Sequence, residues 1–273
     1  MPQGLQTLTF AKLNITGSAF EAVSPISGDS ATFFNVPQES QMYVAELWGC
    51  ISGHAAEMSV TASRWHDQTY GIRGEVTSGA TTAPINRPVC LSPIGVDQPI
   101  FPSDVLSMQV NGTANDEFVS TLLVYYQNLP GISARLATAE YVRQHTKNLV
   151  GINATLTSGT AVPGTAVALN AADNRLHANR DYALLGWSST LTCASLTIQG
   201  IDTGNLRVGG PVLGDPGHDA NFFVDIAKAY NAPLIPIINS NNAGATLLQG
   251  THVVGQSTPL DVLLAELDTN FVG

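Results

Sequence analysis

The residue types that most often carry enzymatic chemistry are spread through this chain without the spacing that such chemistry requires. A metal site in the mouth of a β-barrel needs two histidines close together on one strand, with a glutamate a few residues further on. No H-x-H or H-x₃-H pair occurs among the histidines, which are His54, His66, His145, His177, His218 and His252. We therefore expect no metal ligand of this kind.

Two short segments do combine residues that could form a site. The acidic loop 215–219 (DPGHD) could offer oxygen ligands to Ca²⁺, but it lacks the alternating carboxylates of a calcium loop. We expect a Pro/Gly turn there. The segment 64–67 (RWHD) could contact a sugar or a partner, because tryptophan stacks on apolar faces. We expect a loop packed on a neighbouring subunit.

The chain also lacks the motifs of common catalytic and nucleotide-binding sites. It contains no G-x-S-x-G nucleophile turn, no G-x-x-x-x-G-K-[ST] loop and no G-x-G-x-x-G loop. We therefore predict no catalytic residue, no cofactor-binding residue and no cofactor, and we predict that the protein is not an enzyme.

Composition limits the partners. Only 12% of the 273 residues are charged, and the net charge is −10. Specific nucleic-acid binding needs a basic surface, so we do not expect it. A charge-poor surface is typical of a protein that is covered by neighbouring subunits. Cys50, Cys90 and Cys193 have no metal spacing and are interpreted as buried residues in a reducing compartment. The N-terminus has no basic and apolar segments typical of a signal peptide.

The elements that would position any site follow a pattern of short β-strands. Alternating or β-branched runs predict strands over 5–15, 31–36, 42–51, 57–62, 69–76, 105–110 and 118–126, then over 166–169, 182–187, 195–199, 206–208, 234–238 and the pair within 245–267. The range 209–217 is predicted to be a tight loop and 221–230 a helix.

The second half of the sequence repeats features of the first. Tyr43 and Trp48 match Tyr182 and Trp187 at an offset of 139 residues, and further segments match at offsets of 138 and 140. Repeats of this length are domains, because solenoid units are about 20–50 residues long. Trp48 and Trp187 are predicted to be equivalent core residues.

The predicted fold is all-β, with two tandem jelly-roll-type β-sandwiches joined by a short helical connector. The predicted domains are 1–130 and 152–273, with the connector at 131–151. Within it, 134–149 contains neither Gly nor Pro and carries a positive balance, which predicts a helix that touches the other sandwich or a neighbouring chain.

On this duplication and on the final hairpin of each copy (105–126 and 245–267), the chain resembles the double jelly-roll major capsid proteins of tailless, membrane-containing viruses, including phages. The resemblance implies a structural virion protein. In such a protein, three chains form a pseudo-hexagonal capsomer of an icosahedral shell. It implies self-association, likeness to a homotrimer, contact with other virion proteins, and location in the virion after assembly in the host cytoplasm. Membrane contact is left open.

Two alternatives stay open from the sequence. One is a capsid decoration or minor virion protein. The other, from a different class, is a carbohydrate-binding β-sandwich, although the chain shows no cluster of aromatic residues with paired carboxylates.

Overall fold

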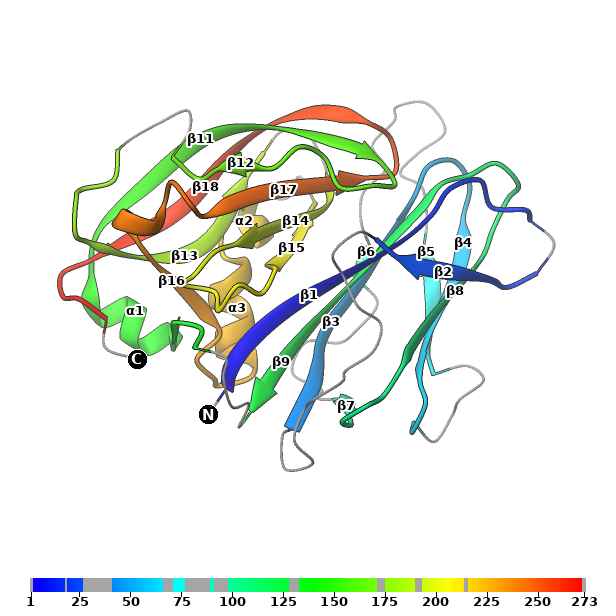
Figure 1. Cartoon of the computed structure of the whole chain (residues 1–273), viewed down its shortest axis with the longest axis horizontal. Helices are drawn as coiled ribbons and strands as arrows, with labels where there is room; N and C mark the ends of the chain where they lie inside the picture. Colours follow the sequence, from blue (N-terminus) through cyan, green and yellow to red (C-terminus); the bar gives the residue numbers. More distant parts are fainter. Residues whose placement is uncertain are drawn as a thin grey trace.

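The computed structural model of this chain describes residues 2–17, 19–26, 41–65, 71–76, 89–90, 98–127, 133–170, 175–189, 193–213 and 216–271. Its architecture is all-β. Two curled sheets lie side by side, one from each half of the sequence, with short helices at the lower end of the second half (Figure 1). The predicted strand at 31–36 lies outside the described residues.

The first sheet contains nine strands in the order β5-β4-β8-β2-β1-β9-β3-β6, and β7 also pairs with β3. Its strands are β1 (Pro2–Lys12), β2 (Glu21–Pro25), β3 (Gln41–Ile51), β4 (Ala56–Ala62), β5 (Ile72–Val76), β6 (Val89–Cys90), β7 (Gln98–Ile100), β8 (Leu106–Asn111) and β9 (Phe118–Gln127). The sheet folds over where β1 meets β2, because these strands pair only at Phe10–Pro25 and Ala11–Ser24. This fold produces a sandwich of two layers, β1-β9-β3-β6 and β2-β8-β4-β5.

The second sheet repeats this plan in the order β10-β16-β13-β18-β11-β17-β14-β15, and β12 pairs with β17. Its strands are β10 (Leu136–Ala137), β11 (Thr146–Thr160), β12 (Val167–Ala168), β13 (Asp181–Ser188), β14 (Cys193–Gln199), β15 (Val208–Val212), β16 (Ile235–Asn239), β17 (Leu247–His252) and β18 (Gln256–Leu267). The helices are α1 (Ala139–His145), α2 (Pro216–Asp219), α3 (Phe222–Ala229) and the 3₁₀ turn η1 (Ser240–Asn242).

The order of the strands is the same in both halves. One layer of the first half is β1-β9-β3-β6, and the second half has β11-β18-β13-β16. The facing layer is β2-β8-β4-β5 in the first half and β12-β17-β14-β15 in the second. This agreement supports the internal duplication that the sequence predicts.

Strand registers fix the offset between the halves at 140 residues. An irregularity interrupts the pairing of β3 between Val44 and Glu46, and one interrupts β13 between Leu184 and Gly186. Leu47 pairs with Leu122 and faces the core of the first sandwich. Its counterpart at this offset is Trp187, which pairs with Val262 and faces the core of the second.

The predicted equivalence of Trp48 and Trp187 is therefore wrong. Trp48 is one residue further along β3 than Leu47, and a shift of one residue turns a side chain to the other face of a strand. Trp48 points out of its own sandwich and donates from Nε1 to the carbonyl oxygen of Ala194, at 2.8 Å. Trp187 donates instead to the carbonyl of Pro211 in β15, at 2.9 Å.

The layer β1-β9-β3 is buried on both faces, and this property joins the two halves. Leu8, Phe10 and Leu122 belong to the first core, while Leu5 and Trp48 belong to the core of the second half. All residues of β9 except the last are buried, as in a central strand with both faces covered. The two sandwiches therefore share a hydrophobic core.

Polar contacts fix how the two sandwiches meet. Thr7 of β1 accepts a hydrogen bond from the backbone N–H of Gly209 at 2.8 Å and donates from its hydroxyl to the carbonyl of Gly209 at 3.1 Å. The Thr7 N–H donates to the carbonyl of Arg207 at 2.7 Å. Tyr230, directly after α3, donates from its hydroxyl to the carbonyl of Ala45 at 2.7 Å.

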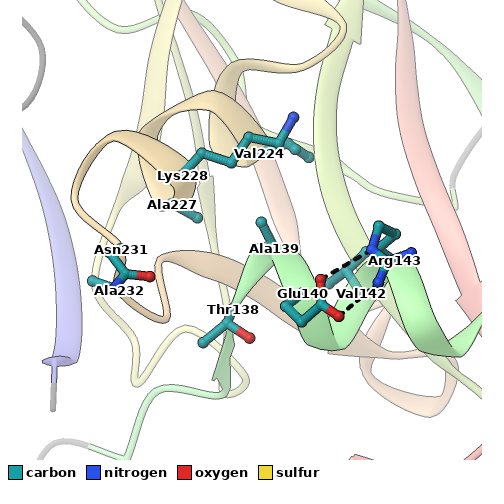
Figure 2. Close-up of a pocket in the computed structure, with 10 residues that line it drawn as sticks. All are labelled: Thr138, Ala139, Glu140, Val142, Arg143, Val224, Ala227, Lys228, Asn231 and Ala232. Atoms are coloured by element: carbon teal, nitrogen blue, oxygen red, sulfur yellow. Dashed lines mark hydrogen bonds and ion pairs between the residues drawn. The ribbon is translucent and has the colours of Figure 1, made fainter.

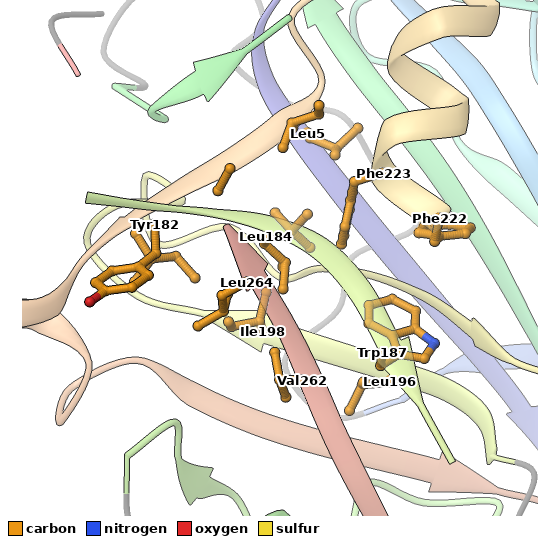
Figure 3. Packing of buried hydrophobic residues seen from close by; sticks show 14 of the residues in the cluster. Leu5, Tyr182, Leu184, Trp187, Leu196, Ile198, Phe222, Phe223, Val262 and Leu264 are labelled. Atoms are coloured by element: carbon orange, nitrogen blue, oxygen red, sulfur yellow. The ribbon is translucent and has the colours of Figure 1, made fainter. Parts of the chain in front are cut away.

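Aromatic side chains fill the core where α3 approaches β13 (Figure 3). Phe222 contacts both tryptophans, with ring centroids 5.3 Å from Trp187 and 6.2 Å from Trp48. Phe223 packs edge-on against Trp187 at 5.7 Å. A side chain on Gly210 would collide with the Phe222 ring, so the glycine lets α3 lie close to β15.

Three sequence expectations are corrected. The predicted helix at 134–149 is confined to α1, because 136–137 pair with β16 and Thr146 begins β11. The predicted loop at 209–217 contains most of β15. The strand β11 was not predicted, because its outward positions are exposed polar residues that interrupt the apolar run.

Candidate functional site

A groove of about 400 Å³ lies between α1 and α3, at the end of the second sandwich where the helices gather (Figures 1 and 2). Its lining is mostly apolar at the floor and charged at the rim, and consists of Thr138, Ala139, Glu140, Val142, Arg143, Val224, Ala227, Lys228, Asn231 and Ala232. This volume falls in the range of small binding pockets, and an apolar floor with few polar groups suits an inserted side chain.

Local sequence explains why α1 forms one wall. Thr138 is the N-cap, and its hydroxyl accepts a hydrogen bond from the N–H of Tyr141 at 3.1 Å. Glu140 in the first turn and Arg143 three residues later form an exposed ion pair, at 2.7 Å. The hydrogen bonds from Arg143 lower the pKa of Glu140. Val142 is the buried residue of this helix, so packing holds α1 through a small apolar contact.

The amphipathic helix α3 forms the other wall. Phe222, Phe223 and Ile226 are buried in the core, whereas Val224 and Lys228, four residues apart, line the groove (Figure 2). Asn231 ends the helix in the left-handed conformation, with φ 45°. The N–H of Asn231 donates to Lys228 and that of Ala232 to Ala227, which is a Schellman motif.

A buried ionic network anchors the segment that leads into α1. Arg135 donates two hydrogen bonds to the carboxylate of Asp181, at 2.9 and 2.7 Å, and one to Asp202 at 3.5 Å. Asp202 also accepts from the N–H of Asn239 at 3.0 Å. Burial raises the pKa of Asp181, but hydrogen bonds from Arg135 and Asn239 outweigh it and the pKa is lowered overall. The network is fully bonded, which indicates a structural role.

The C-terminal segment straps α1 to the sandwich. The N–H of Asp268 donates to the carbonyl of His145 at 2.9 Å, and their side chains lie 3.0 Å apart. Phe271 packs edge-on against Tyr141 at 5.2 Å, and its N–H donates to Asp181 at 2.7 Å. The position of the groove wall therefore depends on the end of the chain.

The segments singled out in the sequence lie apart from this groove. Trp65 is buried and donates from Nε1 to the carbonyl of Pro99, whereas Arg64 is exposed. His66 and Asp67 lie outside the described residues. In the range 215–219, Asp215 and the side chain of His218 are not described, and the buried carboxylate of Asp219 accepts from the N–H of Leu213 at 3.0 and 3.2 Å.

The described histidines lie far apart in the fold, each with its own partner. His54 lies 3.2 Å from Asp116, His177 lies 3.2 Å from the buried Glu266, and Nδ1 of His252 lies 3.0 Å from the N–H of Val254. Over the part of the chain that is described, no three His, Cys, Asp or Glu side chains group as a metal site would require.

Cys50 and Cys193 are buried free thiols near the junction of the two halves, and the side chain of Cys90 is not described. Burial raises the pKa of both thiols, to about 11 for Cys193. Thiols of this kind are unreactive, which suits a packing role. None of the helices in the described ranges is long and apolar enough to cross a membrane.

The sequence analysis did not identify the groove residues. A signal for them was present in α3, where Val224 and Lys228 follow the helical period on the side away from Phe222 and Ile226. What the sequence could not show is that α1 would lie against this side.

Comparisons with known proteins give little more. No protein-family description matches the chain, and no curated protein matches it. A chain in the atomic structure of Sulfolobus Turreted Icosahedral Virus is 12% identical, with 96% of this chain and 91% of that chain covered, at a TM-score of 0.19. Two chains at this TM-score do not have an established fold in common.

Proposed function

We propose that this protein is a structural virion protein, a major capsid protein that builds an icosahedral shell through trimeric capsomers. The observation that carries the proposal is the strand order of the two halves. Counted within each half, strands one, eight, three and six form one layer, and strands two, seven, four and five form the other. This is the order of a jelly roll, a fold of two facing four-stranded sheets that is common in viral capsids.

The arrangement of the halves supports a role in a shell. The sandwiches are joined by a buried, hydrogen-bonded interface rather than by a free linker, so the chain forms one stiff block. A block with sparse charge is suited to wide contacts with neighbours. We propose that its partners are copies of itself and other virion proteins, including those of phages, without a specific nucleic acid, and that it is assembled in the host cytoplasm.

The proposed domains follow the two sheets, at 1–130 and 152–273 with a connector at 131–151. The strand β11 extends the second sandwich back to Thr146, inside the proposed connector. We further propose that the protein has no catalytic or metal site. Replacing each histidine with alanine should then leave assembly unchanged, and elemental analysis of the purified protein should find no stoichiometric metal.

The proposal is tested by electron microscopy of the concentrated, purified protein. We expect three-fold symmetric particles with a pseudo-hexagonal outline, or closed shells made of them. Single, unassociated blocks at every concentration would contradict it. A protein that binds only to preformed shells would instead be a decoration or minor virion protein.

The carbohydrate-binding alternative is less well supported. Trp48, Trp65 and Trp187 are the three tryptophans of the chain, and all are buried. None of them presents a face on which a sugar ring could stack. Binding to a glycan array at a mapped aromatic site would favour this alternative.

A further inference from the structure

We propose that copies of this chain associate head to tail, with the turn at Phe101–Val105 of one copy seated in the groove between α1 and α3 of the next. The proposal rests on the proposed self-assembly and names the surfaces that carry it. Its basis is a rigid, apolar projection on the first sandwich, which we call the knob, and an open apolar groove on the second.

The knob is a stiff turn that displays two apolar side chains. Phe101 and Val105 are 41% and 44% exposed, although each is large and apolar. Asp104 between them is fully buried. Its carboxylate accepts hydrogen bonds from the N–H of Phe101 and from the hydroxyl of Ser63, both at 2.8 Å, and its N–H donates to the carbonyl of Phe101 at 3.0 Å.

This construction holds the aromatic ring outside the core. Ser103 adopts a left-handed conformation, with φ 64°, which is uncommon for a residue other than glycine. A turn that is fixed in this way loses little conformational freedom when a partner binds, which favours association. An aromatic anchor on a preformed turn is typical of the residues that dominate interface energy.

The groove matches the knob in chemistry. Ala139 and Val224 are half-buried on its opposite walls and leave space between them for an inserted ring (Figure 2). The charges also match. Arg64, 57% exposed, lies 3.7 Å from Asp104 at the base of the knob. The rim of the groove offers the exposed carboxylate of Glu140, and the side chain of Asp225 next to it is 47% exposed.

The two surfaces are placed for a ring. The knob belongs to the first sandwich and the groove to the second, and both lie toward the end of the molecule that contains α1 and β7 (Figure 1). A contact between two different surfaces of one chain is heterologous, and repeated copies close into a ring when the rotation allows it. Three copies would complete the proposed capsomer.

The test is sedimentation velocity on purified full-length protein, with one variant for each surface. F101S removes the anchor, and A139W fills the groove. V254S is the matched control, because Val254 is an equally exposed apolar residue, 46%, in the turn between β17 and β18. Circular dichroism melts check that each variant is folded. We expect F101S and A139W to associate at least about 30-fold more weakly than wild type, and V254S to match wild type.

A mixture tests the head-to-tail geometry itself. An A139W copy keeps its knob and an F101S copy keeps its groove, so we expect an equimolar mixture to form one-to-one dimers that neither variant forms alone. Wild-type association of both variants, or no dimers in the mixture, would overturn this contact while leaving the capsomer proposal intact. A monomeric wild type would overturn both.

Discussion

Arg135 shows at the residue scale how a charge-poor chain uses the few charges that it has. Its guanidinium bonds Asp181 and Asp202 from opposite sides of the second sandwich's end and also reaches the carbonyl of Phe271 at 3.0 Å. The two carboxylates are almost completely buried, and a buried charge is tolerated only when it is paired and hydrogen-bonded. The network thus fixes the segment before α1, the turn after β14 and the end of the chain together.

Replacing Arg135 with alanine should destabilise the protein by about 2 kcal/mol. Breaking a fully buried pair costs about 3–5 kcal/mol, and we expect less here because 24% of the Arg135 side chain is exposed to solvent. Urea unfolding at pH 7 measures the change. Arg64→Ala is the control, since that arginine is 57% exposed and makes only a long contact of 3.7 Å. An equal loss in both variants would contradict a special role for Arg135.

The same network predicts how stability depends on acid. The pKa of Asp181 lies below its usual 3.8 in the folded state, so the unfolded chain binds the proton more readily. The stabilisation is therefore complete well above pH 3.8 and is lost as pH falls below it. Urea unfolding from pH 5 to pH 3 should show this decrease, and the decrease should be smaller in Arg135→Ala. An unchanged slope in the variant would contradict the assignment.

At the scale of elements, the sequence predicted strands well where both faces are apolar and poorly where one face is exposed. The strand β9 was predicted almost to the residue, because it is buried on both sides. The strand β11 alternates Ile152, Ala154 and Leu156 inward with exposed polar residues outward. Such a strand carries a weaker signal, and the Asn, Gly and Thr residues within it are typical of turns.

Alternation in β11 makes a testable contrast. Leu156→Ala should cost about 2–5 kcal/mol, because it leaves a cavity in the core of the second sandwich. Thr155→Ala, one residue earlier on the exposed face, should change stability by no more than about 0.5 kcal/mol. Chemical denaturation of the two variants measures both values. A larger loss at Thr155 than at Leu156 would show that the register is wrong.

The groove illustrates what a single sequence could not supply. Lys228 and Val224 lie on the solvent side of an amphipathic helix, a pattern that by itself indicates only exposure. Their role depends on α1, whose position is fixed by Arg135 and by Phe271 near the end of the chain. Contacts between residues more than a hundred positions apart cannot be read from local periodicity. The same holds for Trp48, whose partner Ala194 is in the other half.

At the scale of the whole molecule, the two sandwiches share a core and should unfold together. Leu5, Trp48 and Leu123 of the first half pack into the core of the second, against Phe222 and its neighbours. We predict one cooperative transition in differential scanning calorimetry of the intact chain. Trp48→Ala should cost about 3–5 kcal/mol and affect both halves. Two separate transitions in the wild type would contradict a shared core.

The central claim is that this chain works by assembling with copies of itself. The most direct test is the mass of the purified wild-type protein, measured by size-exclusion chromatography with light scattering over a range of concentrations. We predict a stable species of three times the 28.7 kDa mass of one chain. A mass of one chain at every concentration would contradict the account.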